Sequence, residues 1–406
     1  MNLSFFLAKR LIGKSNHRYS RPVINIAIFA VCLSLSVMLI SLGIINGFQK
    51  EIRNKIIGFD SHIQVTHISD DKSFEQNILP NQNQLKNKIS KINGVTSVQK
   101  FATKAGLIKT EQEFLGIVLK GVDENYSFNS FFNKHLKDGN APNIKSSNLC
   151  NEVIISKSIA NKLSLNVNDT ITTYFIQKPT RVRKFYISGI YDTGLSEFDD
   201  LYIIGDIKHI QRLNKWNKDE CGGLQIKINS FDIINQLTNH INNEIGYDLE
   251  TKNIVELNSQ LFDWLRLQDI NVIIIIVLMI MVALINVGTL LFIIILEKVQ
   301  FIGTLKALGF SNWGIRKIFL YYSFYILSRG MVFGNLLGLG LLLTQKIFKI
   351  IKLDKETYYM SELPIFLDLE NIFLLNIGTI IISIVVLILP TYLISKINPI
   401  KTIRFE

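Results

Sequence analysis

Four apolar blocks constrain the fold of this 406-residue chain more than any other feature of its sequence. They cover residues 23–45, 270–296, 318–343 and 371–395, and each runs for about 23 to 27 residues almost without charge. A helix needs about 20 apolar residues to cross the roughly 30 Å hydrocarbon core of a bilayer. The sequence therefore predicts an α-helical membrane protein with four transmembrane helices.

The first block is longer than the apolar region of a typical secretory signal peptide, and no cleavage site of small residues follows it cleanly. Cys32 lies inside the block without the pattern of a lipidation site. We therefore expect the block to persist as the first transmembrane helix.

Lysine and arginine residues collect in three segments, 1–22 with a net charge of +5, 297–317 with +3 and 396–406 with +2. These sum to +10 of the total of +11, and a four-span topology places all three on one side of the membrane. The positive-inside rule identifies that side as the cytoplasm. Since topology explains the excess charge, and no basic patch is interleaved with aromatic residues, nucleic-acid binding is not predicted.

The predicted organisation follows from these spans. Its segments are a cytoplasmic amphipathic segment at 1–22, the first span at 23–45, an outer domain with stalk helices at both ends at 46–269, the second span at 270–296, a cytoplasmic link at 297–317, the third span at 318–343, an outer loop at 344–370, the fourth span at 371–395 and a cytoplasmic tail at 396–406.

The large outer segment is long enough for one or two folded units, and its mixture of patterns predicts an α+β domain. Expected strands are 61–68, 95–101, 106–110, 114–121, 170–175, 183–191, 201–204 and 224–228, and expected helices lie near 82–92, 157–163, 207–214 and 232–244. A polar stretch at 137–151 is the best candidate for a boundary between two subdomains. Cys150 and Cys221 could form a disulfide here or remain two free thiols.

Apolar residues at helical spacing flank the outer domain on both sides. They are Phe48, Ile52, Ile56 and Phe59 after the first span, and Leu257, Leu261, Trp264 and Leu265, followed by Gln268, before the second. This spacing predicts that both helices continue outside the membrane as a short stalk. A similar spacing of Leu3, Phe6, Leu7 and Leu11 among basic residues predicts an interfacial helix at the N-terminus.

Motifs of enzymes are missing from the sequence. Gly13-Lys14-Ser15 looks like the end of a phosphate-binding loop, but Ala8 stands where that loop needs its first glycine. There is no Cys-x-x-Cys pair and no Gly-x-Ser-x-Gly motif, and the histidines do not pair at metal-ligand spacing. The acids near Asp199 and Asp200 are typical of a solvated turn. We therefore expect no catalytic, metal or cofactor site in this chain.

The cytoplasmic link carries the strongest local signal. It is short and amphipathic, with Ile302, Leu305, Ala307 and Leu308 as its apolar residues and Gly309 at its end. Such a segment can be a plain connecting turn, or it can present an apolar patch to a partner protein.

This link resembles the coupling segment of FtsX/MacB-type ABC transporter permeases, in which the pattern Ile-Gly-x-Leu-Lys-Ala-Leu-Gly contacts the ATPase subunit. The tail at 398–406 is similar to the C-terminal ending of the same family, with Ile403 and Phe405 as departures. Asn46-Gly47-Phe48, the run 201–216 and the approach 262–265 resemble lipoprotein-releasing permeases of the LolC/LolE type.

The resemblance implies a permease subunit of a mechanotransmission-type ABC transporter in the inner membrane, which releases lipoproteins from the outer leaflet to a periplasmic carrier. It implies a separate ATPase subunit that binds the ATP, and a second permease subunit in a homodimer or a heterodimer. Alternatives are a related permease for peptide or drug efflux or for activating a cell-wall hydrolase, or a membrane receptor or scaffold without a motor. The LolC-like and LolE-like roles both stay open.

The residues that the resemblance assigns to ATPase coupling are Glu297, Ile302, Gly303, Leu305, Lys306, Ala307, Leu308 and Gly309. A separate candidate is Arg329, near the middle of the third span, where a cation costs about 2.5 kcal/mol or more unless it faces a bundle, a cavity or a partner. Either the span is shifted so that the side chain reaches the interface, or Arg329 faces a lipid-accepting cavity and contacts membrane lipid or Asn286.

Overall fold

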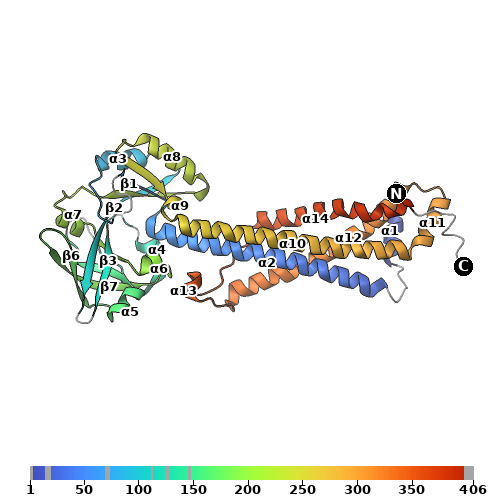
Figure 1. The fold of residues 1–406 in the computed structure, drawn as a ribbon, viewed down its shortest axis with the longest axis horizontal. Helices are drawn as coiled ribbons and strands as arrows, with labels where there is room; N and C mark the ends of the chain where they lie inside the picture. The colour runs from blue at the N-terminus through green and yellow to red at the C-terminus, as the bar shows by residue number, and fades with distance from the viewer. Residues whose placement is uncertain are drawn as a thin grey trace. The chain divides into compact units, whose positions relative to one another are not determined.

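The computed structural model describes residues 3–13, 20–68, 74–110, 113–124, 126, 128–144 and 148–396. The chain divides into two units (Figure 1). Unit 1 consists of Met1–Lys50, Trp264–Lys352 and Glu362–Glu406, and unit 2 of Glu51–Asp263 and Leu353–Ser361. The predicted resemblance of the tail at 398–406 lies outside the described residues.

Unit 1 is built from helices that are long and apolar enough to cross a membrane. These are α2 (Ser20–Asp60), α10 (Ser259–Glu297), α12 (Asn312–Phe348) and α14 (Leu369–Thr391). The first three each contain a predicted apolar block, and the candidate span Leu369–Ser395, which begins with α14, contains the fourth, so the predicted set of spans is confirmed. Buried Leu35, Met38, Phe319 and Leu327 belong to the core between them.

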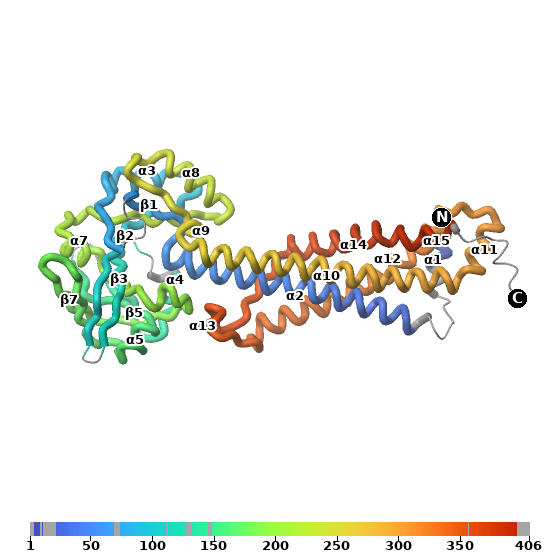
Figure 2. Tube along the Cα trace, in the orientation of Figure 1, coloured from blue at the N-terminus to red at the C-terminus, as the bar shows by residue number. Residues whose placement is uncertain are grey.

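Helices α2 and α10 are the longest described, with 41 and 39 residues. At about 1.5 Å per residue each is about 60 Å long, roughly twice the thickness of the hydrocarbon core. Both helices contribute residues to unit 1 and to unit 2. Figure 2 traces them side by side, and the Phe48 ring packs 5.5 Å from the Trp264 ring. The predicted extension of both helices beyond the apolar blocks is therefore confirmed.

Short helices complete unit 1. α1 (Leu3–Gly13) packs along α12, where Ser4 Oγ donates to Gly314 O at 3.2 Å and the Phe5 ring meets the Tyr321 ring edge-on at 5.6 Å. The helix predicted at the N-terminus is confirmed. α11 (Val299–Ala307) follows α10, and α15 (Leu393–Lys396) follows α14.

Three glycines of α12 let its backbone approach α2. A Cβ atom added at Gly330 would lie 2.7 Å from Val31 Cβ, one at Gly334 would lie 2.9 Å from Cys32 O, and one at Gly338 would lie 3.1 Å from Ser36 Cα. Ser36 Oγ also donates to Gly334 O at 2.9 Å. Small residues at a spacing of four are typical of closely packed membrane helices.

Unit 2 contains a mixed sheet in which the described strands follow the order β10-β1-β9-β2-β3-β8-β5-β7-β4, while β6 pairs with β2 and β7. The strands are β1 (Ile63–His67), β2 (Val95–Lys109), β3 (Phe114–Val122), β4 (Leu136–Gly139), β5 (Glu152–Ser156), β6 (Thr170–Phe175), β7 (Arg181–Tyr191), β8 (Tyr202–Asp206), β9 (Gly223–Ile228) and β10 (Leu249–Asn253). β3 pairs with β8, and β5 with β7, in parallel, and the other pairings are antiparallel.

Helices of unit 2 connect these strands. They are α3 (Gln82–Ile89), α4 (Phe128–His135), α5 (Lys157–Leu163), α6 (Ser196–Asp199), α7 (Lys208–Asn214), η2 (Phe231–Ile233), α8 (Ile234–Glu244), α9 (Ile254–Leu257) and, in the loop after α12, α13 (Lys355–Tyr358). Side-chain caps begin several of them: at α5, Ser156 Oγ accepts from Ile159 N at 3.0 Å, and at α9, Asn253 and Glu256 form a capping box.

The predicted α+β class is confirmed, although single elements differ. The two strands expected at 95–101 and 106–110 form one long strand, β2, and the short strands β4, β5 and β10 were not predicted. The polar stretch at 137–151 begins inside β4, which pairs with β7. Cys150 and Cys221 are both free thiols, half-buried and buried respectively.

Candidate functional site

The link between α10 and α12 forms the first candidate site. It consists of the helix α11 and a turn, in which Gly309 adopts a φ of 85° that favours glycine. Ser311 Oγ then caps α12 by accepting from Gly314 N at 3.1 Å. The chain therefore reverses direction through a short helix with a defined start and end.

The uncharged residues among the predicted coupling residues fall into two groups. Ile302, Gly303 and Leu305 are buried in unit 1. Ala307, Leu308 and Gly309 are exposed, and Leu308 keeps 73% of its surface. An apolar side chain this exposed at the end of a helix can contact a partner, whereas the buried group holds α11 in place.

Charged residues of the link bind within unit 1. Lys306 Nζ donates to Ser395 O at 3.3 Å, and the Arg316 guanidinium donates to Ser395 Oγ and lies 5.0 Å from the Tyr392 ring centre. Glu297 Oε1 lies 3.2 Å from Lys298 Nζ. Lys306 therefore joins α11 to the helix that follows α14.

Arg329 lies on an exposed face of α12, with its guanidinium 4.5 Å from the centre of the Tyr325 ring. It lines a groove of about 670 Å³ between α2 and α12. The lining residues are Asn25, Ile28, Phe29, Cys32, Arg329, Phe333, Leu336 and Leu337. Asn286 lies on α10, where its amide donates to Val282 O at 2.9 Å, one turn earlier in the same helix.

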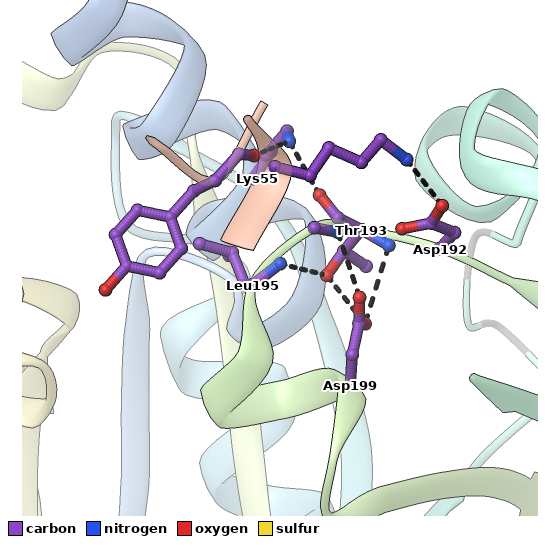
Figure 3. Close-up of polar contacts among 8 residues, drawn as sticks. Lys55, Asp192, Thr193, Leu195 and Asp199 are labelled. Carbon is purple, nitrogen blue, oxygen red and sulfur yellow. Dashed lines mark hydrogen bonds and ion pairs between the residues drawn. The ribbon is translucent and has the colours of Figure 1, made fainter. Parts of the chain in front are cut away.

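A second polar site, in unit 2, was not predicted. Lys55 is buried in the last two turns of α2, and its amine donates to Thr193 O and to Tyr359 O at 2.6 Å each (Figure 3). Nearby, Lys355 Nζ lies 2.5 Å from Asp192 Oδ2. The loop at 353–361 is thus tied to α2 and to the segment after β7 by two lysines.

Asp199 organises the turn that receives Lys55. Its carboxylate accepts from Thr193 Oγ1 at 2.7 Å and from Gly194 N at 2.9 Å (Figure 3). Burial raises the pKa of Asp199 to about 6 and, on the other side of the turn, lowers the pKa of Lys55. Burial alone would raise the pKa of Asp192, but the hydrogen bond from Lys355 and the positive charges of Lys355, Lys137 and Lys157 together outweigh burial, so that this pKa is lowered.

The end of α2 is held by a third lysine. Lys120 of β3 is 1% exposed, and its amine donates to Phe59 O at 2.5 Å and to Asp60 Oδ1 at 2.9 Å. A cation at the C-terminal end of a helix also interacts favourably with the helix dipole. Burial lowers the pKa of Lys120, and the charge of Asp60 opposes this change. The last turn of α2 is therefore fixed inside unit 2 by charge-assisted hydrogen bonds.

Signals for these lysines were present in the sequence. Lys120 interrupts the otherwise apolar strand Phe114–Val122, where a cation needs a buried partner. Lys55 lies inside the apolar stripe of the stalk, three residues after Ile52 and directly before Ile56. The partners of both lysines lie far away in the chain, so the sequence pattern did not identify them.

Comparisons with known proteins agree with this architecture. Residues 26–243 match the family of the MacB-like periplasmic core domain, and residues 273–399 match the FtsX-like permease C-terminal family. The first match identifies the part of unit 2 that follows the first membrane helix in sequence as a periplasmic domain.

Curated relatives match along nearly the full chain. The lipoprotein-releasing system transmembrane protein LolC of Buchnera aphidicola subsp. Schizaphis graminum is 26% identical and covers 96% of this chain and 95% of its own. LolC of Neisseria meningitidis serogroup B is 22% identical, with 98% and 97% covered, and LolE of Haemophilus influenzae is 21% identical, with 98% of each chain covered.

Among solved structures, the periplasmic region of MacB from Actinobacillus actinomycetemcomitans covers 51% of this chain and 95% of its own, at 17% identity and a TM-score of 0.34. The family of the MacB-like periplasmic core domain alone matches more than half of the 406 residues. This chain, a multi-pass membrane protein with a periplasmic domain, therefore belongs to the MacB-like and FtsX-like family of ABC transporter permeases.

Proposed function

We propose that this permease releases lipoproteins from the outer leaflet of the inner membrane to a periplasmic carrier, and that it does so by mechanotransmission. The names of relatives that match over nearly the whole chain support lipoprotein as the cargo. The observation that carries the mechanism is the continuity of α2 from its apolar block to Asp60, where Lys120 anchors it in the periplasmic domain.

A continuous helix that is anchored at its outer end is better suited to transmit movement than to line a channel. Because the last turn of α2 is bound by buried groups, rotation or tilt of the helix cannot be absorbed by a flexible joint at that point. The stalk helices are also bound to each other, since Gln49 Nε2 donates to Asp269 Oδ1 at 2.6 Å. Few charged residues lie in the four spans, which argues against a wide hydrophilic pore.

Force enters through a separate ATPase subunit, which binds the ATP. The exposed residues Ala307, Leu308 and Gly309 form the docking surface, and both termini lie on the same cytoplasmic side. A second permease subunit, identical or different, packs against the exposed apolar faces of the spans. In the most apolar window of α10 only 17% of the residues are buried within this chain.

Depletion of this protein followed by membrane fractionation tests the cargo. We expect lipoproteins destined for the outer membrane to accumulate in the inner membrane, and purified complex with ATP and carrier to release them from vesicles. Normal lipoprotein sorting after depletion would contradict the proposal and favour efflux or activation of a cell-wall hydrolase. A complex without any ATPase subunit would favour the receptor or scaffold.

A further inference from the structure

The groove between α2 and α12 combines a cation with apolar walls. Arg329 provides the charge, Asn25 provides an amide, and Phe29, Phe333 and Leu336 provide exposed apolar surface. No carboxylate belongs to the groove as far as the structure describes its lining. The guanidinium lies against the neutral ring of Tyr325, and the described residues that line the groove give it no carboxylate as a counter-ion.

The position of α1 indicates how deep the groove lies. α1 packs against α12 at Gly314 and Tyr321 and exposes the side chains of Phe5 and Phe6, which is typical of a helix at the membrane interface. Arg329 follows Tyr321 by eight residues, which corresponds to about 12 Å along a helix. A long side chain at this depth can direct its charge toward the headgroup region while its stem stays in hydrocarbon.

The groove is preorganised by its neighbours. Gly330 follows Arg329 directly, and a Cβ atom there would clash with Val31, so α12 is held against α2 at this point. The backbone that carries Arg329 and the opposite wall with Phe29 therefore keep their spacing. A ligand that fills this groove needs little rearrangement of the protein, which lowers the cost of binding.

We propose that this groove binds one anionic phospholipid of the surrounding bilayer, with its phosphate on Arg329 and an acyl chain along Phe29, Phe333 and Leu336. A guanidinium forms paired hydrogen bonds with a phosphate and compensates for the cost of a lone cation in the membrane. A net negative headgroup is preferred because a zwitterionic lipid carries its own cation beside the phosphate. The proposal does not depend on the cargo.

Lipid analysis of the purified permease–ATPase complex tests this site. The complex is reconstituted in nanodiscs that contain phosphatidylglycerol and phosphatidylethanolamine in equal amounts, extracted in mild detergent and analysed by mass spectrometry for retained lipid. We expect retained phosphatidylglycerol to exceed phosphatidylethanolamine about tenfold, which corresponds to about 1.4 kcal/mol. The Arg329→Gln variant should lose this preference, whereas Lys346→Gln, which removes an exposed cation near the other end of α12, should keep it.

A second variant and a crosslink test the site independently of Arg329→Gln, in case that variant does not fold. Leu336 is 66% exposed, so Leu336→Trp should fill the groove without disturbing the core and should lower lipid retention. A photo-crosslinking residue at position 29 should label lipid. Unchanged retention in both Arg329→Gln and Leu336→Trp, equal retention of the two lipids, or a crosslink from position 29 to a protein would overturn the proposal.

Discussion

Lys120 Nζ lies 2.9 Å from Asp60 Oδ1, so that a cation from the middle of the sheet meets the last residue of α2. The Lys120 side chain is 1% exposed and that of Asp60 is 18% exposed. This pair, together with the bond from Lys120 to Phe59 O, connects the membrane helix to the core of the periplasmic domain.

Replacing Lys120 tests this anchor. Lys120→Met leaves Asp60 and the Phe59 carbonyl without their cationic partner, and loss of one member of a buried pair costs about 3–5 kcal/mol when the other stays buried. Because Asp60 is partly exposed, we expect about 2–3 kcal/mol of destabilisation in denaturant unfolding of the full chain in detergent. Lys109→Met, at an exposed position near the end of β2, should cost less than about 0.5 kcal/mol. Equal effects of the two variants would contradict the anchor.

Replacing Lys55 tests the attachment of the loop at 353–361. Lys55→Met removes two hydrogen bonds and leaves two carbonyl groups short of a partner, at about 1–3 kcal/mol for each buried group. We expect faster hydrogen exchange in 353–361 and in 192–195, measured on the intact chain by mass spectrometry. Lys134→Met, at an exposed position of α4, serves as the control. Exchange in 353–361 that matches this control would show that Lys55 does not hold the loop.

Asp199 should make the same region sensitive to pH. Burial raises its pKa from the ordinary value of 3.8 to about 6, so the folded chain binds this proton more tightly than the unfolded chain. Its contribution to stability is therefore complete below pH 3.8 and is lost as the pH rises through about 6. We expect hydrogen exchange of residues 192–200, corrected for its intrinsic pH dependence, to be faster at about pH 7 than at about pH 4.5. The Asp199→Asn variant should show a smaller difference, and an unchanged difference would assign the effect to another group.

The coupling link can be tested at its exposed end. Leu308→Asp should abolish copurification of the ATPase subunit while membrane insertion stays normal, because the side chain is 73% exposed and its loss disturbs no core. Tyr247→Asp, at a fully exposed position of the periplasmic domain, should copurify the ATPase like the wild type. Gly303 and Leu305 are poorer targets, since both are buried and a carboxylate there would damage the fold itself. Retained ATPase binding by Leu308→Asp would place the docking surface elsewhere.

The glycines of α12 give a final prediction. Gly334→Ala places a Cβ atom 2.9 Å from Cys32 O, and overpacking of this kind costs about 1–3 kcal/mol. We expect a lower midpoint of thermal unfolding in detergent. Gly340→Ala, where the added atom meets open space, should leave the midpoint unchanged or raise it. A Gly334→Ala midpoint as high as that of Gly340→Ala would contradict close packing at Gly334.

The membrane helices and much of the sheet could be predicted because their signals are local. A long apolar block determines a span by its length, and alternating residues identify β6 and β9. The strand β10, with the sequence Leu-Glu-Thr-Lys-Asn, has a single apolar residue, Leu249, and pairs with β1 along its whole length. A strand that is stabilised mainly by its neighbour leaves little pattern in its own sequence.

The candidate sites also divide into those with a local sequence signal and those without one. The exposed end of the link at Leu308 follows from an amphipathic segment and a terminal glycine, which are both local. The contact of Lys55 with Tyr359 joins residues 304 positions apart, and nothing near either residue indicates the other. The spacing of Gly330, Gly334 and Gly338 was a local signal for close helix packing that our sequence interpretation did not use.

Those glycines also determine which parts of the molecule can move separately. Because the backbone of α12 touches α2 without an intervening layer of side chains, α12 cannot slide along its axis or turn without displacing α2. The link at α11 is joined directly to α12 through Gly309 and Ser311, and the last turn of α2 is bound by Lys120. In the proposed mechanism the two helices therefore move as one body, which connects the link at α11 with the periplasmic sheet.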